Sequence, residues 1–117
     1  MIPKFRAWEK SLKEMIPVYN IDYRNRLINK DGWRRFDEIV LMQSTGILDK
    51  NGVEIFEGDI IKTTDKNDDN YIGEVRCLVG AWRIDAGSRL IELWGDVCAN
   101  EVLGSVYENP ELLEGII

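Results

Sequence analysis

The chain has 117 residues, of which 44% are hydrophobic and 31% charged, and its net charge is −6. These values are typical of one globular domain with its own core, and they exclude a largely disordered chain. Charges interrupt the first fifteen residues, and the uncharged stretch 39–48 is too short to cross a bilayer. We therefore expect no secretory signal, no contact with a membrane and a cytoplasmic location.

The chain contains no histidine, which excludes Ser–His and Cys–His catalysis and histidine-ligated metals. Its two cysteines, Cys77 and Cys98, do not have the spacing of a zinc site. We expect both to be reduced and buried as small hydrophobic side chains. The sequence predicts a protein that is not an enzyme, with no catalytic residue, no cofactor and no metal.

The charge is unevenly distributed along the chain. Residues 1–35 carry nine basic and four acidic side chains, a balance of +5, whereas residues 36–117 carry six basic and seventeen acidic ones, a balance of −11. The basic segment could face nucleic acid, or it could lie across the acidic remainder, within one chain or between subunits. We favour the second interpretation, because a chain that is acidic overall repels phosphate at long range.

In chain order, an imperfect alternation of apolar and polar residues predicts a strand at residues 4–9. Residues 14–23 are rich in β-branched and aromatic side chains but contain Pro17. Proline lacks an N–H donor, so this strand should lie at a sheet edge or break there. The composition of residues 29–32 is that of a turn.

Residues 33–42 are compatible with two structures. Their apolar residues fit one face of a helix, and the run from Ile39 to Met42 equally fits a buried strand. We favour a strand that ends at residues 43–46.

The second half of the chain is divided by turn residues. Asn51-Gly52 closes a predicted turn at residues 49–52, and residues 54–62 read as strand, turn and strand. Residues 65–70 are polar and mostly charged, as at the tip of a hairpin. Further strands are predicted at residues 71–79, 81–85, 90–94 and 102–107.

The C-terminal segment predicts a short helix of one or two turns. Asn109 can cap it, Pro110 suits the first helical position, and Glu111 favours the positive end of the helix dipole.

Four blocks of sequence resemble the YopX family of phages and prophages, in order and in spacing. They are Met1-Ile2-Pro3-Lys4-Phe5-Arg6-Ala7-Trp8, Leu41-Met42-Gln43-Ser44-Thr45-Gly46 continuing through Asp49-Lys50-Asn51-Gly52, Glu54-Ile55-Phe56-Glu57-Gly58-Asp59-Ile60, and Gly104-Ser105-Val106-Tyr107-Glu108-Asn109-Pro110-Glu111-Leu112-Leu113.

The resemblance implies a mainly β fold, with a small SH3-type β-barrel, additional N-terminal strands and a short C-terminal helical turn. One domain would then cover residues 1–117, with N-terminal strands in residues 1–48 and the barrel core and helical turn in residues 49–117. The resemblance also implies a phage or prophage origin in a bacterial cytoplasm. It implies no biochemical activity.

Three groups of residues could carry chemistry, and each has a simpler structural explanation. Asp65, Asn67 and Asp69 have the spacing of calcium ligands, but Asn70 stands where the loop needs glycine and Arg76 where it needs glutamate. The better interpretation is a solvated hairpin tip.

Carboxylates at positions 49, 57 and 59 could perform acid–base chemistry or hold magnesium, yet each lies at a predicted turn, where acidic residues serve the backbone. Ser44-Thr45-Gly46 has no histidine base and no glycine-rich phosphate cradle. The four tryptophans, at positions 8, 33, 82 and 94, should lie mostly in the core, with one or two available to anchor a partner.

The favoured hypothesis is a binding module that engages an unidentified protein and forms a homo-oligomer. The alternative is a nucleic-acid-binding module that uses the basic N-terminal third. In that case binding depends on four arginines at positions 24, 26, 34 and 35. A weaker possibility is an acidic face that mimics DNA. The sequence does not decide whether residues 1–35 pack on their own barrel or between subunits.

Overall fold

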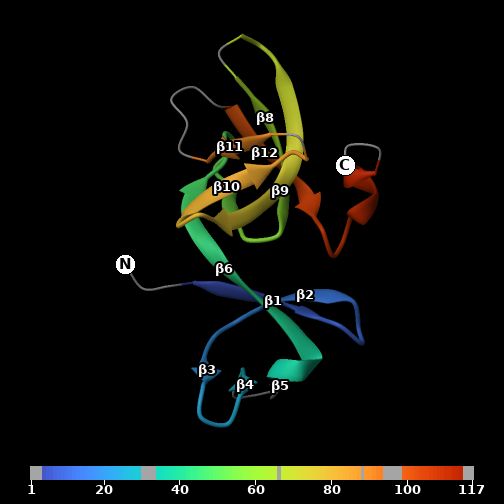
Figure 1. The fold of residues 1–117 in the computed structure, drawn as a ribbon. Helices are drawn as coiled ribbons and strands as arrows, with labels where there is room; N and C mark the ends of the chain where they lie inside the picture. Colours follow the sequence, from blue (N-terminus) through green and yellow to red (C-terminus); the bar gives the residue numbers. More distant parts are fainter. Residues whose placement is uncertain (1–3, 30–33, 66, 88, 94–98, 115–117) are drawn as a thin grey trace. The chain divides into compact units, whose positions relative to one another are not determined.

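The computed structural model describes residues 4–29, 34–65, 67–87, 89–93 and 99–114, and it is mainly β, as the sequence predicted (Figure 1). The chain forms two units, residues 1–44 and 45–117. Each unit has its own buried hydrophobic cluster. The assignment of both parts to one domain stays a prediction.

In the first unit, β1 (Phe5–Glu9) is the central strand. It pairs antiparallel with β2 (Glu14–Pro17) on one side and with the first part of β6 (Ile39–Leu48) on the other. Strand β2 is the sheet edge and ends at Pro17, which confirms the prediction that the proline would lie at an edge or break the strand.

A small second sheet completes this unit. It contains β3 (Ile21–Asp22), β4 (Leu27–Ile28) and β5 (Arg34–Arg35), all antiparallel. Ala7, Ile28 and Ile39 form the buried cluster, and the partly buried Ile16, Val18, Ile21, Phe36 and Leu41 pack against it. The core of the first unit is therefore small and draws on β1, β4 and β6.

The predicted strand over residues 33–42 is wrong at residues 36–38, which form a turn of 3-10 helix, η1 (Phe36–Glu38). The carboxylate of Glu38 accepts hydrogen bonds from the backbone N–H and the Nε of Arg35, at 3.4 and 3.1 Å, and so stabilises the turn. The predicted end at residues 43–46 is also wrong, because β6 continues to Leu48. The backbone N–H of Ser44 donates to the carbonyl of Lys4 at 2.7 Å, which keeps the ladder intact there.

The second unit is built on a curled, five-stranded antiparallel sheet (Figure 1). Its order is β11 (Leu90–Glu92), β10 (Ala81–Asp85), β9 (Asn70–Leu78), β8 (Asp59–Thr64) and β12 (Ala99–Ser105), and the short β7 (Glu54–Phe56) neighbours β6. These strands confirm the predicted ones to within a few residues. The curled sheet is compatible with the expected SH3-type barrel, which stays a prediction.

The predicted turns of the second unit are confirmed. Residues 49–52 connect β6 to β7, and residues 57–58 connect β7 to β8. Gly52 and Gly58 have φ angles of 81° and 85°, which side chains rarely tolerate. These two glycines fix where the chain reverses.

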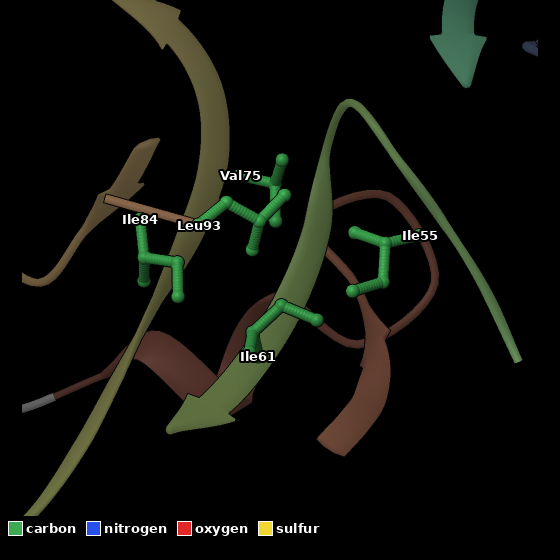
Figure 2. Close-up of a cluster of buried hydrophobic side chains, with 5 residues drawn as sticks. All are labelled: Ile55, Ile61, Val75, Ile84 and Leu93. Carbon is green, nitrogen blue, oxygen red and sulfur yellow. The ribbon is translucent and has the colours of Figure 1, made fainter. Parts of the chain in front are cut away.

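Five side chains form the centre of the second core, namely Ile55, Ile61, Val75, Ile84 and Leu93 (Figure 2). They come from β7, β8, β9, β10 and the residue after β11. Trp82 and Ile91 are partly buried and pack against this cluster. Burial of several isoleucines in one place supplies the main apolar stabilisation of the unit.

The expected burial of Cys77 is wrong, since this side chain is exposed. Cys77 pairs with Trp82 close to the turn at Val79, whose side chain is 88% exposed. At this point the β9–β10 hairpin extends beyond the residues that form the buried core. Cys98 lies outside the described residues.

The C-terminal helical turn is confirmed as η2 (Pro110–Leu113), a 3-10 helix with proline in its first turn. The predicted side-chain cap by Asn109 is wrong. The Oδ1 of Asn109 lies where a side chain on Gly104 would begin, so this amide fills space next to the β12 backbone instead of meeting the helix N–H groups.

One buried carboxylate, that of Asp49, joins two distant parts of the second unit. Its Oδ1 accepts hydrogen bonds from the backbone N–H of Asn51 and of Val53, both at 2.8 Å. Its Oδ2 accepts from the backbone N–H of Val102 in β12 at 3.0 Å. The backbone N–H of Lys50 adds a bond to the carbonyl of Asn100 at 2.9 Å. The β6–β7 turn is thereby attached to the edge of the five-stranded sheet.

The pKa of Asp49 is set by opposing effects. Burial of Asp49 raises its pKa. The backbone hydrogen bonds from Val102, Val53 and Asn51, together with the charge of Lys50, lower the pKa by more than burial raises it. The net pKa therefore lies below the ordinary 3.8. The ionised carboxylate is therefore the form that the fold stabilises. This contribution is complete above the unfolded pKa and is lost as the pH falls through the lower folded pKa.

We predict that Asp49→Asn lowers the free energy of unfolding by about 2 kcal/mol, because a charged acceptor is lost. The amide oxygen can keep the bonds within the turn, but the amide nitrogen then faces the N–H of Val102. Urea unfolding measures the loss, and hydrogen exchange should show faster exchange at Val102. Asp68→Asn at the exposed hairpin tip is the matched control. Unchanged stability of Asp49→Asn would contradict this role.

Thr63 provides a second test of the core. It is 1% exposed, and its Oγ1 has no hydrogen-bond partner among the described residues. The neighbouring Thr64 donates from its Oγ1 to the Oδ1 of Asn70 at 2.7 Å. We predict that Thr63→Val raises the free energy of unfolding by about 1 kcal/mol, because it removes an unsatisfied buried hydroxyl. Thr64→Val, the matched control, should lower it slightly. Both are read from urea unfolding, and destabilisation by Thr63→Val would overturn the interpretation.

Candidate binding surface

The turn between β3 and β4 carries two arginines of the first unit, Arg24 and Arg26. The carboxylate of Asp22 accepts from the backbone N–H of Asn25 at 3.1 Å and from its Nδ2 at 2.8 Å. These bonds, the side-chain one foremost, hold the pKa of Asp22 below its usual 3.8. Arg26 has a φ of 57°, the left-handed conformation that ends such a turn. Arg24 and Arg26 are therefore presented by backbone that is fixed locally.

A groove of about 550 Å³ opens next to this turn. It is lined by Asn25, Arg26, Arg35, Phe36 and Asp37. The backbone N–H of Phe36 donates to the carbonyl of Arg26 at 2.9 Å, so the turn and η1 are attached to each other. We call this concavity the arginine groove.

A second groove, of about 420 Å³, lies on the same unit and is mainly aromatic and apolar. It is lined by Lys4, Phe5, Val18, Tyr19, Asn20, Ile21 and Tyr23. The backbone N–H of Tyr19 donates to the Oδ1 of Asn29 at 2.9 Å, and the Nδ2 of Asn29 donates to the carbonyl of Pro17 at 2.9 Å. Asn29 thus fixes the chain on one side of this aromatic groove.

The two grooves share an aromatic boundary. The rings of Tyr23 and Phe36 meet edge to face, with centroids 6.4 Å apart and an interplanar angle of 87°. Tyr23 nevertheless remains 68% exposed, and Tyr19 is 79% exposed. Large exposed tyrosines beside arginines are the residue types that dominate binding interfaces.

The arginines around the arginine groove differ in how far they are neutralised. The Nε of Arg35 lies 3.1 Å from a Glu38 oxygen and 3.7 Å from an Asp37 oxygen. Within the part of the chain that the structure describes, Arg24 and Arg26 form no ion pair. Their charges are available to a ligand. Arg34 lies in β5 and has interactions of its own.

The comparisons with known proteins agree with the sequence motifs. The sequence model of the YopX protein family matches residues 4–114. The chain belongs to this family. A relative described as the SPbeta prophage-derived uncharacterized protein YopX of Bacillus subtilis (strain 168) is 32% identical over 72 residues. That match covers 56% of this chain and 54% of the relative, so it spans about half the relative's length.

Solved structures of similar chains support the same YopX-family fold. Protein EF1440 from Enterococcus faecalis is 31% identical, with a TM-score of 0.62 over 97% of this chain and 99% of that one. Protein yopX from Bacillus subtilis is 22% identical, with a TM-score of 0.68 over 95% of this chain and 98% of that one. The second likeness shows the fold alone.

Two of the three turn carboxylates that could have carried chemistry in this YopX-family chain, Asp49 and Asp59, accept hydrogen bonds from backbone N–H groups. Asp59 is buried, and its Oδ2 accepts from the N–H of Phe56 at 2.8 Å. Asp49 binds the three N–H groups described above. Thr45 donates to the carbonyl of Ile55 at 2.7 Å and accepts from the N–H of Ile47 at 3.1 Å. These groups are occupied by the fold, as the structural interpretation of each expected.

Glu57 and Glu74 form an electrostatic cluster with Tyr107 on the second unit. Burial raises the pKa of Glu74, Arg76 lowers it, and the carboxylates of Asp85 and Glu57 raise it. The pKa of Tyr107 is raised by burial and then by Glu74 and Glu57. No group of three or more metal-ligating side chains is formed by the described residues. This cluster could not be predicted from the sequence, because it forms where the β7–β8 turn meets β9 and the segment after β12. The backbone N–H of Gly58 donates to the carbonyl of Val75 at 3.0 Å, and that of Val106 donates to the carbonyl of Gly58 at 2.9 Å.

The remaining sequence candidates are placed as follows. Trp8 and Trp82 are half-buried, and Trp82 packs on the second core, while Trp33 and Trp94 lie outside the described residues. Among the residues that the structure places, no helix has the length and apolar composition needed to cross a bilayer. The two grooves were not predicted, because each is formed by segments that are separated in the sequence.

We predict that Asp22→Ala loosens the turn that presents Arg24 and Arg26, and that the Asn25 amide then exchanges faster with solvent. Because the folded pKa of Asp22 is lowered, the bond should persist above the ordinary pKa and be lost as the pH falls through the lower folded value. Hydrogen exchange followed by NMR measures both effects. Glu14→Ala, at the exposed start of β2, is the control. Equal exchange at Asn25 in both variants would contradict the assignment.

Proposed function

We propose that this chain is a non-enzymatic protein-interaction module that self-associates in the cytoplasm of the bacterial cell that makes it. The observation that carries the proposal is the opposite charge of its two units. Residues 1–44 hold nine basic and six acidic side chains, a balance of +3, and residues 45–117 hold six basic and fifteen acidic ones, a balance of −9. Copies with this polarity attract one another in a head-to-tail arrangement.

The grooves of the first unit supply the specific part of such an interaction. Charge complementarity steers association, whereas affinity comes from a few well-placed aromatic and arginine side chains. Tyr19, Tyr23 and Arg26 line or border concavities and are exposed. The prophage origin of the relative from Bacillus subtilis supports a phage or prophage context for this chain.

A second candidate function is the binding of single-stranded nucleic acid by the same face. The specific observation in its favour is the presence of two exposed tyrosines, Tyr19 and Tyr23, on the same unit as Arg24 and Arg26, since aromatic rings stack on bases and arginines pair with phosphates. The charge of −9 on the second unit disfavours it. This function predicts that the affinity for an oligonucleotide falls steeply with salt.

We predict that light scattering coupled to size exclusion gives a mass above that of one chain at low salt, and that the mass falls as salt is added. Salt screens the attraction between the oppositely charged units. The same series in the presence of a single-stranded oligonucleotide separates the two candidates. A single-chain mass at every salt concentration, together with salt-sensitive oligonucleotide binding, would replace the proposed function by the second candidate.

A further inference from the structure

The turn between β8 and β9 is acidic and contains Asp65, Asp68 and Asp69. The Oδ1 of Asp65 accepts from the backbone N–H of Asn67 at 2.8 Å and of Asp69 at 3.0 Å. The backbone adds a bond from the N–H of Asp68 to the carbonyl of Asp65 at 3.0 Å. The carboxylate of Asp65 therefore stabilises the conformation of this turn through hydrogen bonds to its backbone.

Asp68 and Asp69 are the exposed carboxylates of this tip. Both side chains are exposed, and neither forms an ion pair with a described residue. Asp68 has a φ of 63°, so it is held at the apex in the left-handed conformation. The tip thus presents two carboxylates on a fixed turn, in the same way that the β3–β4 turn presents Arg24 and Arg26.

The two turns are complementary in charge. The acidic turn is the end of a hairpin. Arg26 lines the concavity of about 550 Å³ together with Asn25, Arg35, Phe36 and Asp37, and Arg24 precedes Asn25 in the same turn. Turns that are fixed in advance lose little conformational entropy when they bind. Charge-assisted hydrogen bonds from arginine to carboxylate are the strong contacts available to such a pair.

We propose that the β8–β9 tip of one copy of this chain binds in the arginine groove of a second copy, with Asp68 and Asp69 facing Arg24 and Arg26. The inference rests on the proposed self-association and names the two surfaces that carry it. Each copy then offers one tip and one groove. The contact is heterologous, so it repeats from copy to copy and produces chains or closed rings.

A second copy fits the groove better than nucleic acid does, because a second copy also gives the exposed carboxylates of the tip a cationic partner, which nucleic acid does not. Phosphate would leave Asp68 and Asp69 unpaired and would meet the repulsion of the acidic unit. A tip that reaches the groove of its own chain would satisfy both turns without any oligomer, and the experiment below separates that case.

The test uses two variants of the full chain that neutralise one surface each. The groove variant carries Arg24→Gln and Arg26→Gln, and the tip variant carries Asp68→Asn and Asp69→Asn. Asparagine keeps the left-handed preference at position 68. The controls, which remove charge elsewhere on each unit, are Lys13→Gln for the groove variant, and Glu111→Gln with Glu114→Gln for the tip variant. Circular dichroism melts confirm that each variant is folded.

Sedimentation velocity should show self-association weakened about ten-fold in each test variant and retained in both controls. An equimolar mixture of the groove and tip variants should form a one-to-one dimer that does not extend, because the intact tip of one binds the intact groove of the other. Oligomers that persist in both test variants would overturn this inference and leave the proposed self-association standing. A wild-type chain that stays monomeric, with or without oligonucleotide binding, would overturn both.

Discussion

The carboxylate of Asp49 is the interaction on which the architecture of the second unit depends. It holds the β6–β7 turn through two backbone N–H groups and the β12 edge through a third, 53 residues away in the sequence. A sheet edge with free N–H groups is a site for unwanted strand pairing, and here one side chain closes part of it. Burial of the carboxylate has a desolvation cost, which its three hydrogen bonds as a charged acceptor offset.

Other carboxylates of the chain also bind backbone N–H groups. Asp59 and Asp65 do so, and the carboxylate of Glu9 accepts from the N–H groups of Ser11 and Leu12 and from the Ser11 hydroxyl.

Local sequence patterns predicted the features of the fold that are determined locally. Glycines at the 49–52 and 57–58 turns, alternation in β1 and the proline at the end of β2 each act on their own segment, so they could be read without the structure. Long-range pairing decided the rest. Strand β6 passes through residues 43–46 because its neighbours supply a ladder there, and Cys77 is exposed because β9 is longer than the core beneath it. The 3-10 turn at residues 36–38 depends on the Glu38 carboxylate, whose partner could not be inferred from periodicity.

The candidate binding surface was only partly predictable for the same reason. The excess of basic residues near the N-terminus indicated a charged face, and the absence of histidine excluded most catalysis. Which charges are free is a property of the fold. Arg35 is neutralised by its acidic neighbours, whereas Arg24 and Arg26 are not, and among the tip carboxylates Asp65 serves the backbone. Carboxylates that accept backbone hydrogen bonds, such as that of Asp65, serve the fold, whereas exposed carboxylates such as those of Asp68 and Asp69 are accessible to a partner of opposite charge.

In the proposed self-association, the β3–β4 turn of one copy meets the β8–β9 tip of another. The most direct measurement is NMR chemical-shift mapping as the concentration of the unmodified chain is raised at low salt. We expect chemical-shift changes at the β3–β4 turn, around Arg24 and Arg26, and at the β8–β9 tip, around Asp68 and Asp69. These changes should reverse when salt is added. Shifts confined to other surfaces, or none at all over the concentration range in which the mass rises, would contradict this contact between copies.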